Sequence, residues 1–162
     1  GGEINDQSLI ARHVGDLQIG VYVAPSYVER LGAPAHPREL ENTDHRIVGF
    51  LSSRTGKIDP LVLRCESEHI EITGSYLLAV DDGNTYLEAG LAGLGVIALP
   101  VYMAAAHQTA GSLIPLFEDW RINPMPLYLA FPPNRHVNAR LRVFIDWIVE
   151  LMRQHVAITY NK

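Results

Sequence analysis

An uncharged stretch from Ala89 to Ala106 does most to constrain the fold, because glycine and proline divide it into short pieces. A run of this length without charges approaches what a transmembrane helix needs. It is interrupted, however, at Gly90, Gly93, Gly95 and Pro100. Glycine commonly ends helices and proline commonly begins them, so the stretch predicts a helix of small residues, a buried strand over residues 96–99 and a second helix from Pro100. No membrane span is expected.

The remaining chain alternates between runs typical of strands and runs typical of helices. A short helix is predicted over residues 25–31, closed by Gly32, and a long amphipathic helix is predicted near the C-terminus. Ile70 and Ile72 alternate with polar residues, which predicts a hairpin or meander with the run that follows them. Apolar runs predict further strands at residues 17–23, 46–51, 76–80, 113–117 and 127–131. This alternation predicts an α/β sandwich with a mixed sheet.

Composition excludes several classes of protein. With 162 residues, of which 48% are hydrophobic, the chain can bury an ordinary core and is not a disordered tail. Its formal net charge of -5 argues against direct DNA binding, because phosphate contacts need clustered Lys and Arg. The single cysteine, Cys65, allows no intramolecular disulfide and fits a reducing cytoplasm. No signal peptide is visible, and Gly1 as first residue leads us to expect a fragment or a processed chain.

A search for catalytic and cofactor motifs gives none that fits its context. The glycines of residues 90–95 are spaced somewhat like a dinucleotide loop, but they end a helix and lead into a strand, so capping and helix packing explain them better. Four side chains could be proposed as metal ligands, namely Glu66, Glu68, His69 and Glu71. In an extended segment they point to both faces, so we interpret them as a solvated sheet surface. We therefore expect no catalytic residue, no metal and no cofactor.

Two polar clusters remain as candidate binding residues. Ser52, Ser53 and Arg54 follow an apolar strand, and open α/β sheets bind ligands at the carboxyl ends of their strands. Their hydroxyls, amides and guanidinium suit an anionic or carbonyl-bearing molecule. The second cluster lies between a strand and a helix and contains Asp81, Asp82 and Asn84. Helix capping explains these residue types by itself, and a binding role can coexist with it.

Several ordered segments between Ser8 and Leu151 resemble the effector-binding domain of LysR-type transcriptional regulators. Two of the longest are Ala-Gly-Leu-Ala-Gly-Leu-Gly-Val-Ile-Ala-Leu-Pro over residues 89–100 and Leu-Ile-Pro-Leu-Phe-Glu-Asp-Trp over residues 113–120. The others cover residues 8–12, 24–28, 32–40, 80–83, 126–128 and 140–147. Their order and spacing over most of the chain carry the resemblance.

The resemblance implies a periplasmic-binding-protein-like (type 2) α/β fold, in which two crossover strands join two subdomains around an effector cleft. By this analogy residues 1–24 and 128–162 form subdomain I, and residues 25–127 form subdomain II. Roughly sixty residues that open the family's domain have no counterpart here, so we expect subdomain I to be incomplete. The family's helix-turn-helix is also absent from this chain, which assigns DNA binding to the parent protein.

The resemblance also implies a function, namely a cytoplasmic regulatory domain that binds a small metabolite and has no catalytic activity. The cleft is expected between the two polar clusters and the crossover near Ala130 and Phe131. Gly2 and Glu3 are further lining candidates, because they fall on a family loop that reaches the cleft. A carboxylate or an aromatic metabolite would suit such a cleft, but neither the effector nor the target promoter follows from the sequence.

Two other classes of protein share this fold. A free-standing periplasmic-type solute-binding protein is the first alternative, and a signal peptide in the parent gene would favour it. An enzyme of the same fold is the second, and it would need a polar catalytic constellation that the sequence does not display. A helix-turn-helix in the parent gene would favour the regulator.

The closing helix carries an apolar face that needs a partner. Its apolar positions follow three-four spacing, at Val137, Leu141, Phe144, Ile145, Ile148, Leu151 and Met152. By the resemblance, this face packs on the part of subdomain I that is missing here. We therefore expect a homo-oligomer, most simply a homodimer that buries the face or pairs an open strand edge, or else high mobility in subdomain I.

Overall fold

The computed structural model describes residues 9–42, 44–131 and 139–158. The chain divides into two compact units, with Gly1–Gln18 and Pro124–Lys162 in unit 1 and Ile19–Asn123 in unit 2. The subdomain boundaries expected from the resemblance, near Ala24 and Tyr128, lie a few residues away from these limits.

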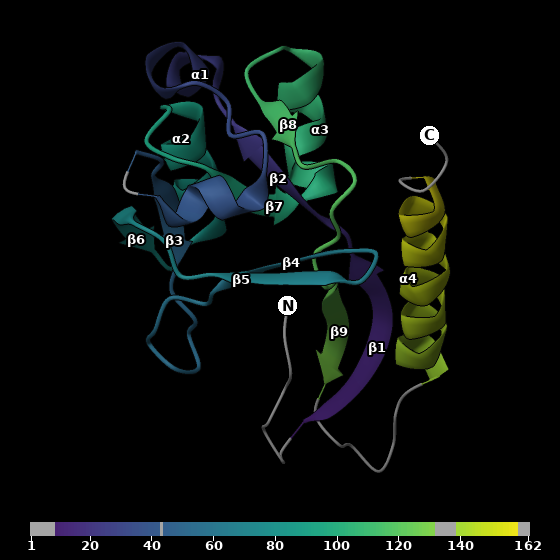
Figure 1. Cartoon of the computed structure of the whole chain (residues 1–162). Helices are drawn as coiled ribbons and strands as arrows, with labels where there is room; N and C mark the ends of the chain where they lie inside the picture. The colour runs from purple at the N-terminus through teal and green to yellow at the C-terminus, as the bar shows by residue number, and fades with distance from the viewer. Residues whose placement is uncertain (1–8, 43, 132–138, 159–162) are drawn as a thin grey trace. The chain divides into compact units, whose positions relative to one another are not determined.

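Unit 2 contains an antiparallel sheet and a parallel strand pair (Figure 1). In the antiparallel sheet, β2 (Ile19–Val23) lies between β7 (Ile97–Pro100) and β8 (Ile114–Leu116). In the parallel pair, β3 (Ile47–Phe50) lies beside β6 (Tyr76–Val80).

A parallel bridge between Ile47 and Val96 connects the two sets of strands. Val48 N donates a hydrogen bond to Val96 O at 3.0 Å, and Val96 N donates one to Arg46 O at 2.9 Å. The strand order across unit 2 is therefore β6-β3-β7-β2-β8. The prediction of a mixed sheet is confirmed, because this order contains both parallel and antiparallel neighbours.

The predicted hairpin between the run at Ile70 and Ile72 and the run after it is wrong. The first run is β5 (Glu68–Ile72), which pairs antiparallel with β4 (Leu61–Cys65). Glu66 turns the chain between these strands with a φ of 50°. The turn sequence Glu-Ser lacks the glycine that signals a tight hairpin, so the sequence pattern does not reveal β4 as the partner.

The predicted helices of unit 2 are confirmed. α1 (Pro25–Leu31) ends at Gly32, whose φ of 77° favours glycine. α2 (Gly83–Leu91) and α3 (Val101–Thr109) stand before and after β7, so the uncharged stretch is helix, strand and helix. A 3-10 helix, η1 (Pro37–Glu41), adds one turn between α1 and β3. Among the described helices, none combines the length and hydropathy that a membrane span needs.

Two glycines of the uncharged stretch allow close packing around β7. A Cβ at Gly90 would overlap the side chain of Ile97, which is fully buried. A Cβ at Gly95 would lie 2.9 Å from the Arg46 carbonyl oxygen and 3.0 Å from the Val48 nitrogen, the two groups that bond to the next residue. These glycines therefore serve packing, as their position between helix and strand predicts.

The core of unit 2 covers both faces of the sheet. Val21 and Ile47 belong to one buried cluster, whereas their strand neighbours Tyr22 and Val48 belong to a second. Successive residues of a strand point to opposite faces, so the two clusters lie on opposite sides of the sheet. The first also contains residues of α1, η1, β4 and β5, and the second contains residues of α2 and α3. The helices α2 and α3 thus cover one face, and α1, η1 and the β4–β5 hairpin cover the other.

Unit 1 combines segments from both ends of the chain. β1 (Ile10–Leu17) pairs antiparallel with β9 (Met125–Phe131), with an irregularity between His13 and Gly15. The predicted C-terminal helix is α4 (Ala139–Ile158), and it packs against β1.

α4 buries only part of its apolar face. Ile145 is buried, and Arg12 Nη1 of β1 lies 2.8 Å from Asp146 Oδ1. Leu141 and Phe144 share the apolar face but are exposed, Phe144 by 50% of its surface. Val137, the first position expected on this face, lies outside the described residues.

Gly95→Ala should lower the free energy of unfolding by about 1–3 kcal/mol, because the new methyl group would press on backbone atoms of β3 at the parallel bridge. Urea unfolding followed by circular dichroism measures this. Gly83→Ala is the matched control: the nearest atom to a Cβ there is Met103 Cε at 4.0 Å, and its effect should stay within about 0.5 kcal/mol. Equal losses in the two variants would contradict the packing role of Gly95.

Candidate functional site at the carboxyl edge of the sheet

Three strands of unit 2 end at one edge of the sheet. Phe50 of β3 pairs with Val80 of β6, and Leu51 N donates a hydrogen bond to Val80 O at 2.8 Å. β7 runs parallel to β3 from the bridge at Val96, so Pro100 at its end lies at the same edge. The carboxyl edge is where open α/β sheets bind ligands, because loops and helix N-termini meet there.

The loop after β3 is a tight turn that carries the first predicted cluster. Ser52 N donates a hydrogen bond to Lys57 O at 2.9 Å, and Gly56 N donates one to Ser52 O at 2.7 Å. Ser53 and Arg54 are exposed on the turn, while Ser52 is partly buried. The backbone is therefore held in place, and the polar side chains of residues 53 and 54 face solvent.

The loop after β6 carries the second cluster and begins α2. Asp82 Oδ1 accepts hydrogen bonds from Thr85 N at 2.8 Å and from Thr85 Oγ1 at 2.9 Å, which confirms the capping interpretation for this residue. Those bonds, with a further one from the Asn84 amide, hold the pKa of Asp82 below its usual value. Asp81 and Asn84 are exposed beside it. The cap therefore occupies amide hydrogens that an incoming anion would otherwise use.

Tyr86 fixes the start of α2 against the sheet. Its hydroxyl accepts a hydrogen bond from Ala98 N of β7 at 3.1 Å. Its ring meets Phe50 at the end of β3 edge to face, with 5.4 Å between the ring centroids. Burial raises the pKa of Tyr86 to about 12, so the hydroxyl stays protonated at neutral pH. One side chain of α2 thus contacts both the end of β3 and the backbone of β7.

The structure adds the start of α3, which the predicted site does not include. α3 follows Pro100 directly, and among the described side chains none caps its first amides. Tyr102 in its first turn is 62% exposed. The side chain of Met103 reaches to 4.0 Å from where a Cβ at Gly83 would stand, so α2 and α3 begin close to each other. A proline between a strand and a helix was the signal in the sequence that could have included this segment.

The edge as a whole offers a defined set of groups to a ligand. Arg54 and the uncapped amides of α3 can bind a carboxylate or carbonyl oxygen. Tyr102, in the first turn of α3, exposes a ring that can contact a planar or apolar group. The groups suit binding and orientation of a small molecule.

The other predicted site residues are not brought into this site by the structure. Phe131 is the last residue of β9 and Ala130 precedes it, so both belong to unit 1. Gly2 and Glu3 lie outside the described residues. The role of all four in ligand binding stays a prediction.

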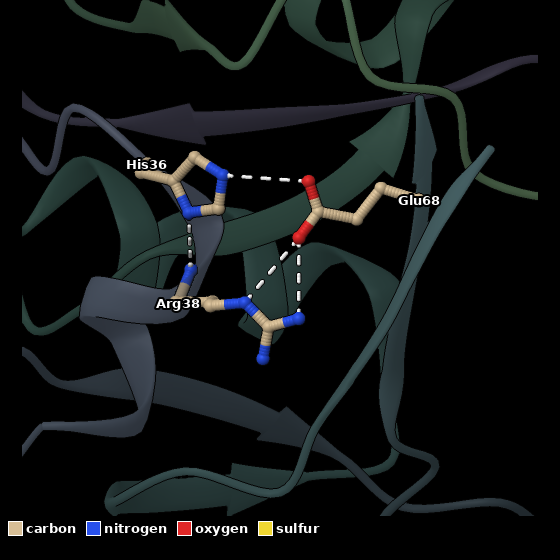
Figure 2. A network of polar contacts seen from close by, with 3 residues as sticks. All are labelled: His36, Arg38 and Glu68. Atoms are coloured by element: carbon tan, nitrogen blue, oxygen red, sulfur yellow. Dashed lines mark hydrogen bonds and ion pairs between the residues drawn. The ribbon is translucent and has the colours of Figure 1, made fainter. Parts of the chain in front are cut away.

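Glu68, one of the four side chains weighed as metal ligands, belongs to a polar network on unit 2 (Figure 2). Its Oε1 accepts from Arg38 Nε at 3.3 Å and Nη2 at 3.1 Å, and its Oε2 lies 3.9 Å from His36 Nε2. His36 Nδ1 also accepts from Arg38 N at 3.2 Å and so caps η1. The network ties η1 to β5. Within the described residues, no group of three or more potential ligands could hold a metal ion.

Comparison with protein families gives one match that spans most of the chain. A family model described as the LysR substrate binding domain matches residues 1–153. An HTH-type transcriptional repressor of Pseudomonas aeruginosa is 29% identical over 98% of this chain and 49% of its own length. The uncharacterized HTH-type transcriptional regulator YhjC of Escherichia coli is 31% identical over 96% of this chain and 51% of its own length. The chain thus spans about half the length of the relatives it matches.

Solved structures show the same relationship. The regulatory domain of CrgA, a LysR-type transcriptional regulator from Neisseria meningitidis, superposes with a TM-score of 0.76 and 27% identity, over 93% of this chain and 72% of that one. Full-length AphB, the Vibrio cholerae virulence activator, gives a TM-score of 0.75 and 25% identity, over 92% of this chain and 49% of that one. The fold is therefore the periplasmic-binding-protein-like type 2 α/β fold of such regulatory domains, which confirms the fold that the resemblance implied.

Asp82→Ala should lower the melting temperature, because Thr85 loses the acceptor for its amide and its hydroxyl. Asp82→Asn, which keeps an acceptor oxygen, is the matched control and should lose less. The pKa of Asp82 is lowered from 3.8 on folding, so its ionised form contributes stability that is present above that value and is lost as the pH falls through the lowered pKa.

The stability difference between wild type and D82N should therefore shrink below about pH 4. Thermal unfolding followed by circular dichroism at neutral and acid pH measures it. Equal melting temperatures for D82A and D82N at neutral pH would show that the cap has no such role.

Proposed function

Because the chain belongs to the LysR substrate-binding domain family, we propose that it is the effector-sensing part of a LysR-type transcriptional regulator. In this role it binds a small metabolite and thereby changes the activity of a DNA-binding part elsewhere in the regulator. The relatives are named as HTH-type regulators and are about twice as long, which supports a helix-turn-helix outside this chain. The net charge of -5 also supports a DNA-binding part outside this chain, because a negatively charged chain does not attract the phosphates of DNA.

One observation carries the assignment of the site: the turn that bears Arg54 and the start of α2 follow strands that pair in parallel and end together. The ligand-binding residues proposed from the sequence, Ser52, Ser53, Arg54, Asp81, Asp82 and Asn84, all lie in these two loops. We extend the proposed site to the start of α3, since its amides are uncapped and Tyr102 is exposed there.

Electrostatics favour one class of effector for this site. The carboxylate of Asp82 caps α2, so the partial positive charge at the start of that helix is already neutralised. Arg54 and the amides of α3 stay available for negative charge, and Tyr102 for a ring. The proposed effector is a small carboxylate. An aromatic carboxylate is favoured, because its ring could contact the ring of Tyr102.

The remaining parts of the proposal rest on the family. We infer that the family's two subdomains correspond to the two compact units, with β2 in the sheet of unit 2 and not in subdomain I. Phe131, Gly2 and Glu3 stay proposed ligand-binding residues on the resemblance to the family alone. The proposed regulator acts in the cytoplasm as a homo-oligomer, uses no cofactor and does not convert its effector.

Arg54→Ala in the full-length regulator should raise the effector concentration for half-maximal response by about tenfold or more, because a charge-assisted hydrogen bond is lost. The measurement is a promoter–reporter assay across a panel of aliphatic and aromatic carboxylates. Arg54→Lys keeps the charge and should recover part of the response. Arg64→Ala, which removes an exposed guanidinium from β4, is the matched control and should leave it unchanged.

A response that Arg54→Ala leaves unchanged would overturn the proposed site. Conversion of a responding carboxylate into a product by the purified protein would overturn the regulatory role itself.

A further inference from the structure

We propose that Lys57 is a specificity-determining residue of the site and that the effector is a dicarboxylate, whose second carboxylate Lys57 binds. The inference rests on the proposed function, in which Arg54 binds one carboxylate of the effector. Three features of the turn after β3 carry it, namely its register, the side of β3 on which the chain returns, and the two positive charges that the turn leaves unpaired.

The register of the turn pairs Lys57 with Ser52. Leu51 forms an antiparallel bridge with Ile58, and Ser52 N donates a hydrogen bond to Lys57 O at 2.9 Å, so Ser52 and Lys57 are the next opposing pair. Opposing side chains of an antiparallel pair lie on the same face, and successive residues alternate between the two faces. Lys57 therefore shares a face with Ser52, a residue of the proposed site, and Ile58 lies on the other face.

The face of Lys57 is the one that α2 covers. Ile58 packs against Gly49, where a Cβ would lie 2.9 Å from Ile58 Cδ1. Phe50, the next residue of β3, points to the opposite face, and its ring meets Tyr86 of α2. Because Lys57 and Ile58 also point to opposite faces, Lys57 lies on the same face as Phe50 and α2.

The chain returns along the side of β3 where β7 lies. Alternate amides of a strand point to the same side, so Ser52 N points the same way as Val48 N, which bonds to Val96 just before β7. Leu51 N points to the other side and bonds to β6. The segment that begins at Lys57 thus follows Val96 along β3, and β7 leads directly into α3. Lys57 is therefore on the side of β3 toward the uncapped start of α3.

Lys57 and Arg54 give one turn two exposed positive charges. Neither side chain takes part in the ion pairs that the structure shows between described residues. Asp59, the carboxylate that the register places on the same face, is exposed and forms no such pair with Lys57. One carboxylate satisfies one of the two cations, so a second acidic group on the same ligand gains a charge interaction that a monocarboxylate does not make.

Isothermal titration calorimetry on the purified full-length regulator, at one ionic strength, tests the inference with pairs of acids that differ by one carboxylate. The probes are butanoate against butanedioate and benzoate against benzene-1,3-dicarboxylate. Wild type should bind at least one dicarboxylate about fivefold or more tightly than its monocarboxylate partner. Lys57→Gln keeps a polar side chain but removes the charge, so it should abolish this preference by weakening the dicarboxylate much more than the monocarboxylate.

Two variants control for charge and for general surface effects. Lys57→Arg keeps the positive charge and should keep the preference. Arg64→Gln removes an exposed cation from β4, outside the site, and should bind both acids of each pair like wild type. Arg54→Ala should weaken both members of each pair, because the carboxylate that it binds is present in both.

The outcomes separate the role of Lys57 from the proposed function. A wild type that binds neither dicarboxylate, or that binds both members of each pair equally, would overturn the inference. A preference that survives Lys57→Gln would overturn it too. If Arg54→Ala still weakens an acid in these cases, the proposed effector site stands without Lys57, whereas loss of the Arg54 effect would overturn the site itself.

Discussion

The parallel contact between β3 and the residue before β7 holds the rest of unit 2 together. Arg46 O and Val48 N bond to Val96, and the chain can come this close because Gly95 has no side chain to separate the two backbones. This contact joins the antiparallel β7-β2-β8 sheet to the parallel β3–β6 pair. Without it, the start of α3 would not share an edge with the turn after β3 and the start of α2, which the β3–β6 pairing brings together. The extension of the proposed binding site to α3 is therefore a consequence of one backbone approach.

Capping and ligand binding make competing demands at this edge. A helix N-terminus attracts negative charge, and at α2 the carboxylate of Asp82 already supplies it. The start of α3 has a proline in the same position, so its amides keep their capacity to bind an oxygen atom. The two helices, which are equal in length, thus contribute differently. The amides that begin α2 are capped by Asp82, whereas those that begin α3 can donate hydrogen bonds to a ligand. Tyr86 holds α2 against the sheet, because it contacts Phe50 at the end of β3 and Ala98 within β7.

The two units differ in how completely they bury their apolar surface. In unit 2 both faces of the sheet are covered, and the exposed leucines of β6 are confined to its edge. In unit 1 a single strand pair meets a 20-residue helix, and large side chains such as Trp147 stay exposed. Exposed apolar surface of this size commonly marks contact with other protein. The solved CrgA domain contains more chain than this sequence covers, since the match accounts for 72% of it.

The sequence by itself determined the local elements and, through an ordered set of segments, the family. Glycine and proline act on the residues beside them, so the order of α2, β7 and α3, the end of α1 at Gly32 and the cap at Asp82 could be read along the chain. Only the tertiary structure decided which strands became neighbours. The alternation at Ile70 and Ile72 shows that one face is buried, but it does not say that β4 is the partner, because a strand's pattern records its burial and not the strand it bonds to. For the same reason the sequence does not reveal that the start of α3 belongs to the site. Pro100 and Leu51 are far apart in sequence, and it is the backbone hydrogen bonds of Val96 with the β3 segment that bring them to one edge.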